Sequence, residues 1–140
     1  MPRSLTLPNE FRIAVARMSR RIRTSVADET ISFPHLAAMA TLAKFQPLTL
    51  QELSAKERVT PPSMLRTVNA LVEHGYIERT PHETDGRKLM LGVTASGEAM
   101  LEATRRQRNL WLADRIEELS DDDRATLKRA VDIMLTMAEA

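Results

Sequence analysis

Two adjacent prolines follow a threonine in the stretch "VTPPSMLRTVNALVEHG", and this triplet restricts where a helix begins. Proline has no backbone N–H and is tolerated only in the first turn of a helix, where that N–H would have no intrahelical partner. Thr60 offers an N-cap oxygen, and Gly75 is a typical residue just beyond a helix C-terminus. The sequence therefore predicts a helix that begins at Pro61 and ends close to Gly75.

A shorter helix is predicted directly before this one, because Thr49 can cap it and Gln51, Glu52, Leu53 and Ala55 are adequate helix formers. In the longer helix, the apolar residues gather on one side at 100° per residue. These are Met64, Leu65, Val68, Leu71 and Val72, and the opposite side carries Pro62, Ser63, Arg66, Thr67, Ala70 and Glu73. That opposite side is nearly uncharged and made of small groups, which suits close approach to a surface such as a DNA major groove.

A β-hairpin is expected after the two helices. The segments "YIERT" and "KLMLGVT" have the composition of strands, and Pro81 and the pair Asp85-Gly86 between them are turn signals. A helix–turn–helix followed by such a hairpin is a winged helix. The alternative is a plain surface hairpin, and the helix pair before it favours the wing.

Three further helices are expected outside this module. One runs from Asn9 to about Ala27, one is capped by Thr94 and extends to about Leu119, and one follows the cap at Ser120. A helix capped by Ser32 belongs to the module itself. Because a compact monomer has limited surface on which to bury the outer helices, we expect them to interleave in a twofold homodimer.

The fold class predicted is mostly α with a small β-hairpin (α+β), a winged helix-turn-helix with N- and C-terminal dimerisation helices. Residues 1–140 form a single domain, in which residues 30–95 make the DNA-binding lobe. The dimerisation region comprises residues 1–29 and 96–140.

Charge is unevenly distributed although the net charge is only +1. Residues 1–27 carry six arginines against one acid, Glu10, whereas residues 98–140 carry seven bases against ten acids. The basic end fits a nucleic-acid partner, and a solvated helix face is the simpler interpretation. The module itself is balanced, with six bases and six acids between Thr49 and Thr94, so DNA binding must depend on one basic face.

Several classes of function are disfavoured. The chain has no Cys, which excludes disulfides and thiol chemistry and suits a reducing compartment. Its three histidines, His35, His74 and His82, lack metal-ligand spacing, and no phosphate loop or hydrolase motif is present, so neither a metal, a cofactor nor an enzyme is expected. No segment has the length of a signal peptide core or a membrane span, and we expect a cytoplasmic, nucleoid-associated protein without membrane contact.

The chain resembles the MarR (multiple antibiotic resistance regulator) family of bacterial winged-helix transcription factors. At the wing, Asp85-x-Arg87 and then Val93-Thr94-x-x-Gly97 match the family pattern of D-x-R, a short strand, an aliphatic residue, T and G. The recognition-helix segment matches at Val59, Thr60, Arg66, Val68, Leu71, Gly75, Ile77 and Arg79. The chain departs from the family at Glu57 and Arg58, where an aliphatic residue and glycine are common, and at Pro62, where a small polar residue is common.

The resemblance and the chemistry of the residues together suggest the DNA-contacting groups. They are Thr60, Pro62, Ser63, Arg66 and Thr67 on the recognition helix and Arg87 and Lys88 in the wing, with His82 a weaker candidate for a phosphate. An N-cap role for Thr60 is at least as good an explanation of this residue as a phosphate contact. Arg87 resembles the family arginine that enters the minor groove, and Asp85 and Arg79 are expected to position the wing.

The resemblance implies a homodimeric repressor that binds a palindromic operator in double-stranded DNA. A small aromatic, phenolic or anionic effector would release it, and no residue of this chain is assigned to the effector. His35 and arginines of the first helix such as Arg17 or Arg21 carry groups that suit a carboxylate, but a capping or surface role is the better explanation of each. The alternative hypothesis is a winged-helix dimer that acts through protein contacts without specific DNA binding.

Overall fold

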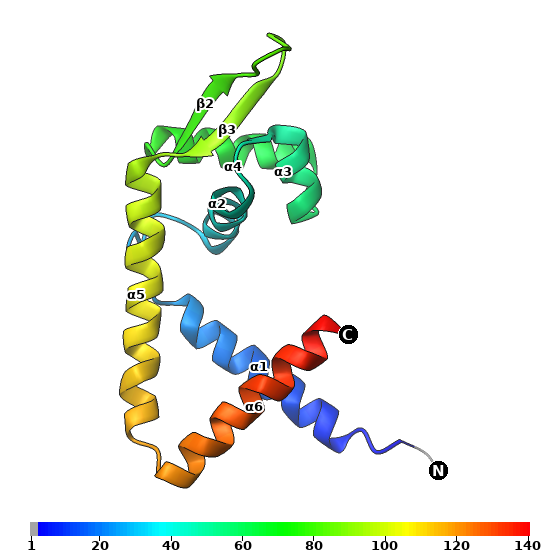
Figure 1. Ribbon diagram of the computed structural model, residues 1–140, viewed down its shortest axis with the longest axis vertical. Helices are drawn as coiled ribbons and strands as arrows, with labels where there is room; N and C mark the ends of the chain where they lie inside the picture. Colours follow the sequence, from blue (N-terminus) through cyan, green and yellow to red (C-terminus); the bar gives the residue numbers. More distant parts are fainter. Residues whose placement is uncertain (1–2) are drawn as a thin grey trace. The chain divides into compact units, whose positions relative to one another are not determined.

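The computed structural model describes residues 3–140 and is mostly helical, with one small antiparallel sheet (Figure 1). In chain order the elements are α1 (Thr6–Arg23), α2 (Phe33–Phe45), β1 (Leu48–Thr49), α3 (Leu50–Glu57), α4 (Pro61–Glu73), β2 (Ile77–Pro81), β3 (Leu89–Val93), α5 (Ala95–Glu117) and α6 (Asp121–Glu139). The predicted fold class is confirmed. No helix among the described residues is long and apolar enough to cross a membrane.

The chain divides into two compact units. The winged unit is Arg23–Gln107, and the helical unit consists of the described residues up to Ile22 together with Arg108–Ala140. Helix α5 contributes its first half to the winged unit and its second half to the helical unit.

The winged unit contains the hydrophobic core. Its buried apolar residues come from the loop before α2, from α2, α3, α4 and the sheet, and from the start of α5. They are Ile31, Leu36, Ala38, Met39, Leu42, Leu48, Leu53, Met64, Val68, Leu71, Ile77, Leu91, Val93 and Met100. On α4, Met64, Val68 and Leu71 are buried as the helical spacing predicts. Leu65, predicted on the same apolar face, is 44% exposed, because it lies at the edge of that face beside an open hollow under the wing.

The sheet has strand order β1-β3-β2, with both pairs antiparallel. The hairpin strands β2 and β3 pair from Ile77 opposite Val93 to Pro81 opposite Leu89, so both predicted strands are confirmed to within one residue. The two-residue strand β1 was not predicted, because Leu48 and Thr49 are too few to show a strand pattern. It pairs with β3 immediately before α3, and it ties the helix pair to the wing.

The first helix ends at Arg23, four residues before the predicted end at Ala27. The following residues have partners in the winged unit instead. The Ala27 N–H donates to the Thr104 hydroxyl at 3.0 Å, and Val26 packs against the core. These long-range contacts make the chain turn where local periodicity alone predicts a longer helix.

The helical unit has a different character, because none of its described residues is buried. Helices α1 and α6 expose large apolar side chains, among them Leu7, Phe11, Ile133 and Leu135. Two guanidinium groups lie over the Trp111 ring, that of Arg21 at 5.6 Å and that of Arg115 at 3.7 Å from the ring centroid.

Gly97 shows why the wing must be followed by a residue without a side chain. A Cβ placed there would collide with the Tyr76 carbonyl oxygen and lie 2.6 Å from Cγ1 of Val93. Thr94, three residues earlier, accepts the Gly97 N–H at 3.0 Å and donates its own hydroxyl to the Gly75 carbonyl at 2.6 Å. The T-x-x-G pattern thus joins the start of α5 to the end of the recognition helix.

Replacing Gly97 by Ala should lower the free energy of unfolding by about 2 kcal/mol, because overpacking outweighs the roughly 1 kcal/mol of better helix propensity. Chemical denaturation measures the change. The neighbouring variant Ser96→Ala is the control, since Ser96 is exposed and its loss should alter stability by less than about 0.5 kcal/mol. Equal stability of the two variants would contradict the close approach at Gly97.

Candidate nucleic-acid interface

The recognition helix α4 begins where the prolines predict. Pro61 and Pro62 occupy its first turn, and the Thr60 side chain accepts the Ser63 N–H at 3.4 Å, which confirms its cap role. Helix α3 has a full capping box, in which Thr49 accepts the Glu52 N–H and Glu52 accepts the Thr49 N–H. The second of these hydrogen bonds lowers the pKa of Glu52.

The turn between α3 and α4 retains a left-handed residue although it has no glycine. Arg58 adopts φ 55° and ψ 42°, and its N–H and that of Val59 donate back to the end of α3. A non-glycine residue in this conformation costs about 1 kcal/mol. Glu57, beside Arg58, accepts a hydrogen bond from the Thr41 hydroxyl of α2, so its carboxylate connects α2 to α3.

The outward face of α4 presents the residues expected to meet DNA. Pro62 and Arg66 are exposed, whereas Ser63 and Thr67 are half-buried. Arg66 forms no ion pair with any described residue, so its guanidinium keeps all its donors for an external partner. Backbone N–H groups at the start of the helix add a partial positive charge that favours phosphate.

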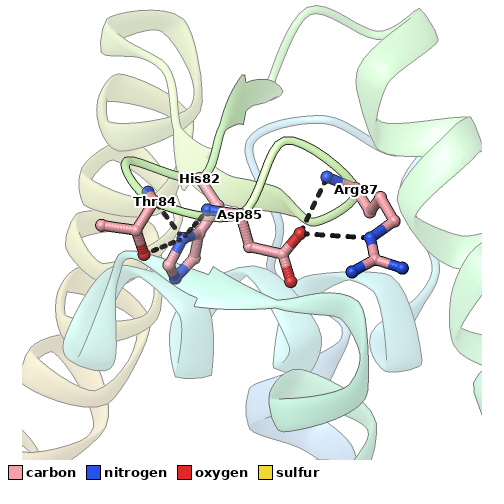
Figure 2. A network of polar contacts seen from close by, with 4 residues as sticks. All are labelled: His82, Thr84, Asp85 and Arg87. Atoms are coloured by element: carbon pink, nitrogen blue, oxygen red, sulfur yellow. Dashed lines mark hydrogen bonds and ion pairs between the residues drawn. The ribbon is translucent and has the colours of Figure 1, made fainter.

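The wing places a second guanidinium at the surface (Figure 2). Arg87 has a side chain that is 96% exposed, and Asp85 holds it in two ways. The Asp85 carboxylate accepts the Arg87 N–H at 3.1 Å, and the same oxygen lies 3.7 Å from its Nε. These contacts fit the positioning role predicted for Asp85, which stays a prediction. Lys88 is exposed next to Arg87.

Arg79 contacts the recognition helix, because its Nη2 donates to the side-chain oxygen of Asn69 on α4. This hydrogen bond joins the base of β2 to α4 and so fixes the wing relative to the helix. Asn69 was missed by the sequence analysis, since nothing in its neighbours along the chain indicates a partner ten residues away.

A hollow of about 380 Å³ lies between the start of α3, α4 and the wing. Its apolar wall includes Pro61, Leu65, Val68, Leu89 and Leu91. Arg79, Arg87 and Lys88 also line it, and no acid does. The three cations therefore produce a positive potential where the recognition helix meets the wing.

The far end of α4 is anchored by a polar network. Asp28, in the loop after α1, accepts hydrogen bonds from the Thr30 hydroxyl and the Tyr76 hydroxyl, both at 2.5 Å, and from the Thr30 N–H at 2.9 Å. These bonds, the Thr30 hydroxyl first, lower the pKa of Asp28 to about 2, and the bond to Asp28 raises the pKa of Tyr76. The His74 ring, which caps α4, lies 3.0 Å from the Thr30 hydroxyl and stacks on Tyr76.

The structure places the predicted residues in two groups on the winged unit, on α4 and in the wing. No group of three or more His, Cys, Asp or Glu among the described residues could hold a metal ion. His35 is at the start of α2, where its N–H donates to Ser32, and burial lowers the pKa of its ring.

Comparisons with known proteins identify similar chains. A model of the MarR family matches residues 31–89. The HTH-type transcriptional regulator Mb0904 of Mycobacterium bovis is 37% identical over 133 residues, which cover 95% of this chain and 93% of that protein. The crystal structure of RV1404 from Mycobacterium tuberculosis has a TM-score of 0.84 at 25% identity and covers 97% of this chain and 95% of its own. FabT of Streptococcus pneumoniae, crystallised in complex with DNA, has a TM-score of 0.69 at 19% identity, and the match covers 97% of this chain and 98% of the FabT chain.

Replacing Asp28 by Asn should lower stability at neutral pH by about 1 kcal/mol, a value discounted for solvent screening of this partly exposed group. The folded-state pKa of about 2 lies below the ordinary 3.8, so the carboxylate stabilises the protein above about pH 4. That contribution is lost as the pH falls from about 4 to about 2. Denaturation across this range should show the parent and Asp28→Asn converging in acid, and a constant difference would contradict the network.

Proposed function

The chain belongs to the MarR family of helix-turn-helix transcriptional regulators, and from this premise we propose that it is a homodimeric repressor of a palindromic operator. In this proposal, a small aromatic or anionic effector releases the protein from DNA. The family and the relatives it matches are transcriptional regulators and not enzymes. The observation that carries the proposal is the pair of exposed guanidinium groups, Arg66 on α4 and Arg87 in the wing.

The two arginines suit two kinds of contact. Arg66 lies on a helix face of small groups that can approach base edges in the major groove, where a guanidinium can form two parallel hydrogen bonds with guanine. Arg87 extends from a narrow hairpin and suits the minor groove, where A·T-rich segments attract a guanidinium. Thr60, Ser63, Thr67 and Lys88 would contact phosphates, and Pro62 would pack against the backbone.

The helical unit supports the homodimer. Because none of its described residues is buried, the apolar side chains of α1 and α6 lack sufficient cover within one chain. A second copy related by a twofold axis would cover the same surface on both chains and present two recognition helices to a palindrome. We propose that residues 1–29 and 96–140 form this region and residues 30–95 the DNA-binding lobe.

The hollow beneath the wing supports release by an anionic aromatic effector. Its apolar wall suits a ring, and Arg79, Arg87 and Lys88 suit a carboxylate or phenolate. Because Arg87 and Lys88 are also proposed DNA contacts, an anion bound there would compete for the same charges. Release of the operator would then raise expression of the adjacent genes.

The substitution Arg87→Ala should weaken binding to all duplexes and reduce the salt dependence by about one unit of slope per chain. The substitution Arg66→Ala should cost about 1 to 3 kcal/mol and also relax base preference at one operator position. Fluorescence anisotropy with operator and point-substituted duplexes measures both effects. Arg106→Ala, an exposed charge outside α4 and the wing, is the control and should bind like the parent.

If Arg66→Ala and Arg87→Ala bind operator DNA as the parent does, the assigned roles are wrong. A hydroxybenzoate added to the same titration tests the effector: release of the parent protein is expected. Unchanged binding across a panel of hydroxybenzoates would contradict an effector of this class.

Sedimentation equilibrium should give the mass of two chains for the parent protein. Leu135 on α6 is 59% exposed, and Leu135→Glu should shift the protein toward monomer because a carboxylate would be buried in the interface. Lys128→Glu on the same helix introduces the same residue at an exposed charged position and serves as the control. A parent protein that sediments as a monomer would contradict the dimer.

A further inference from the structure

The imidazole of His82 lies inside the wing turn (Figure 2). Its Nδ1 is 3.2 Å from the Thr84 N and 3.1 Å from the Asp85 N, and both N–H groups donate to it. The Thr84 hydroxyl is a further neighbour at 3.3 Å. A ring nitrogen that accepts N–H groups uses its lone pair and cannot carry a proton, so this geometry requires the neutral imidazole with its hydrogen on Nε2.

The turn that His82 organises leads directly to the wing arginine. Backbone hydrogen bonds from the His82 N–H to the Lys88 carbonyl and from the Lys88 N–H to the Asp85 carbonyl, both 3.0 Å, close the loop. His82 holds the Asp85 N–H, and the Asp85 carboxylate holds the N–H and Nε of Arg87. Two consecutive links, from His82 to Asp85 and from Asp85 to Arg87, therefore connect an uncharged imidazole to the exposed guanidinium.

We propose that His82 is a positioning residue for DNA binding, whose neutral ring shapes the wing so that Asp85 presents Arg87. Protonation of Nδ1 removes the acceptor, places an N–H against two N–H donors, and opens the turn. DNA affinity then falls in acid. This inference rests on the proposed function, because it requires Arg87 to contact DNA.

The direction in which DNA affinity changes with pH distinguishes a positioning role of His82 from a direct contact between His82 and a phosphate. The charged residues of the same loop are Glu83, Asp85, Arg87 and Lys88. A hollow beside the ring is lined by Pro47, Thr80, Pro81, Glu83, Thr84 and Met90, and Glu83 is the one charged side chain among these lining residues. A protonated histidine near phosphates would by itself strengthen binding. Weaker binding in acid is therefore the opposite of what a mere phosphate contact by His82 produces.

The test uses His82→Asn and His82→Ala in the full-length protein. An Asn side chain can accept backbone N–H groups two and three residues on and does not titrate, so it should rescue the turn. DNA affinity is measured by anisotropy at about pH 8 and about pH 5.5, the range in which histidine changes charge. Thermal unfolding at both pH values checks that the variants remain folded.

We expect the parent to lose about tenfold in affinity between the two pH values, which corresponds to about one lost hydrogen-bonded contact. His82→Asn should bind as the parent does at the higher pH and lose much less DNA affinity in acid. This variant retains His35 and His74, so it shows how much of the pH dependence comes from the other histidines. His82→Ala should bind weakly at both. An equal pH dependence of the parent and His82→Asn would overturn the proposal.

Nuclear magnetic resonance of the free protein tests the hydrogen bonds of the wing turn independently of DNA binding. Nitrogen shifts of the His82 ring should show a hydrogen on Nε2 at the higher pH, and the Thr84 and Asp85 amides should lose protection in acid in the parent only. A ring with its hydrogen on Nδ1, or amides that do not respond, would overturn the proposal. If the amides respond but Arg87→Ala binds DNA as the parent does, the failure lies in the DNA role of Arg87 and not in the turn.

Discussion

Burial of Met64, Val68 and Leu71 holds α4 against the core, and that packing decides which face of the helix reaches the surface. Burying each such side chain is worth about 1.5 to 3 kcal/mol, more than any polar contact at the surface of the helix. Arg66 faces outward because these three residues face inward. The hydrogen bond between Arg79 and Asn69 then links the wing to the same helix.

Much of this arrangement could be predicted from local patterns. The caps at Thr49, Thr60 and Ser120 all act as expected, because N-cap chemistry involves residues only three apart. The contacts that could not be predicted join distant segments, as Asp28 does to Tyr76 and Arg79 to Asn69. The acceptor role of the His82 ring was also missed, since a histidine in a charged loop resembles a surface residue until the backbone is seen.

The departures from the family pattern have local explanations. Arg58 takes the left-handed conformation that glycine usually provides, at a cost of about 1 kcal/mol, so the turn before α4 is preserved. Glu57 is engaged by Thr41 and is half-buried, which removes one of the acids that favoured a protein-binding role for the module. The exposed cations of α4 and the wing include Arg66, Arg79, Arg87 and Lys88.

Sequence-specific DNA binding by this protein can be measured with an anisotropy titration of the purified protein. The duplex upstream of its own gene would be compared with a scrambled duplex of the same composition at two salt concentrations. We expect tighter binding to the upstream duplex than to the scrambled one, and an affinity that falls steeply as the salt concentration rises. Equal binding to both duplexes at either salt, and no preferred sequence after selection from random duplexes, would contradict it and favour a role in protein contacts.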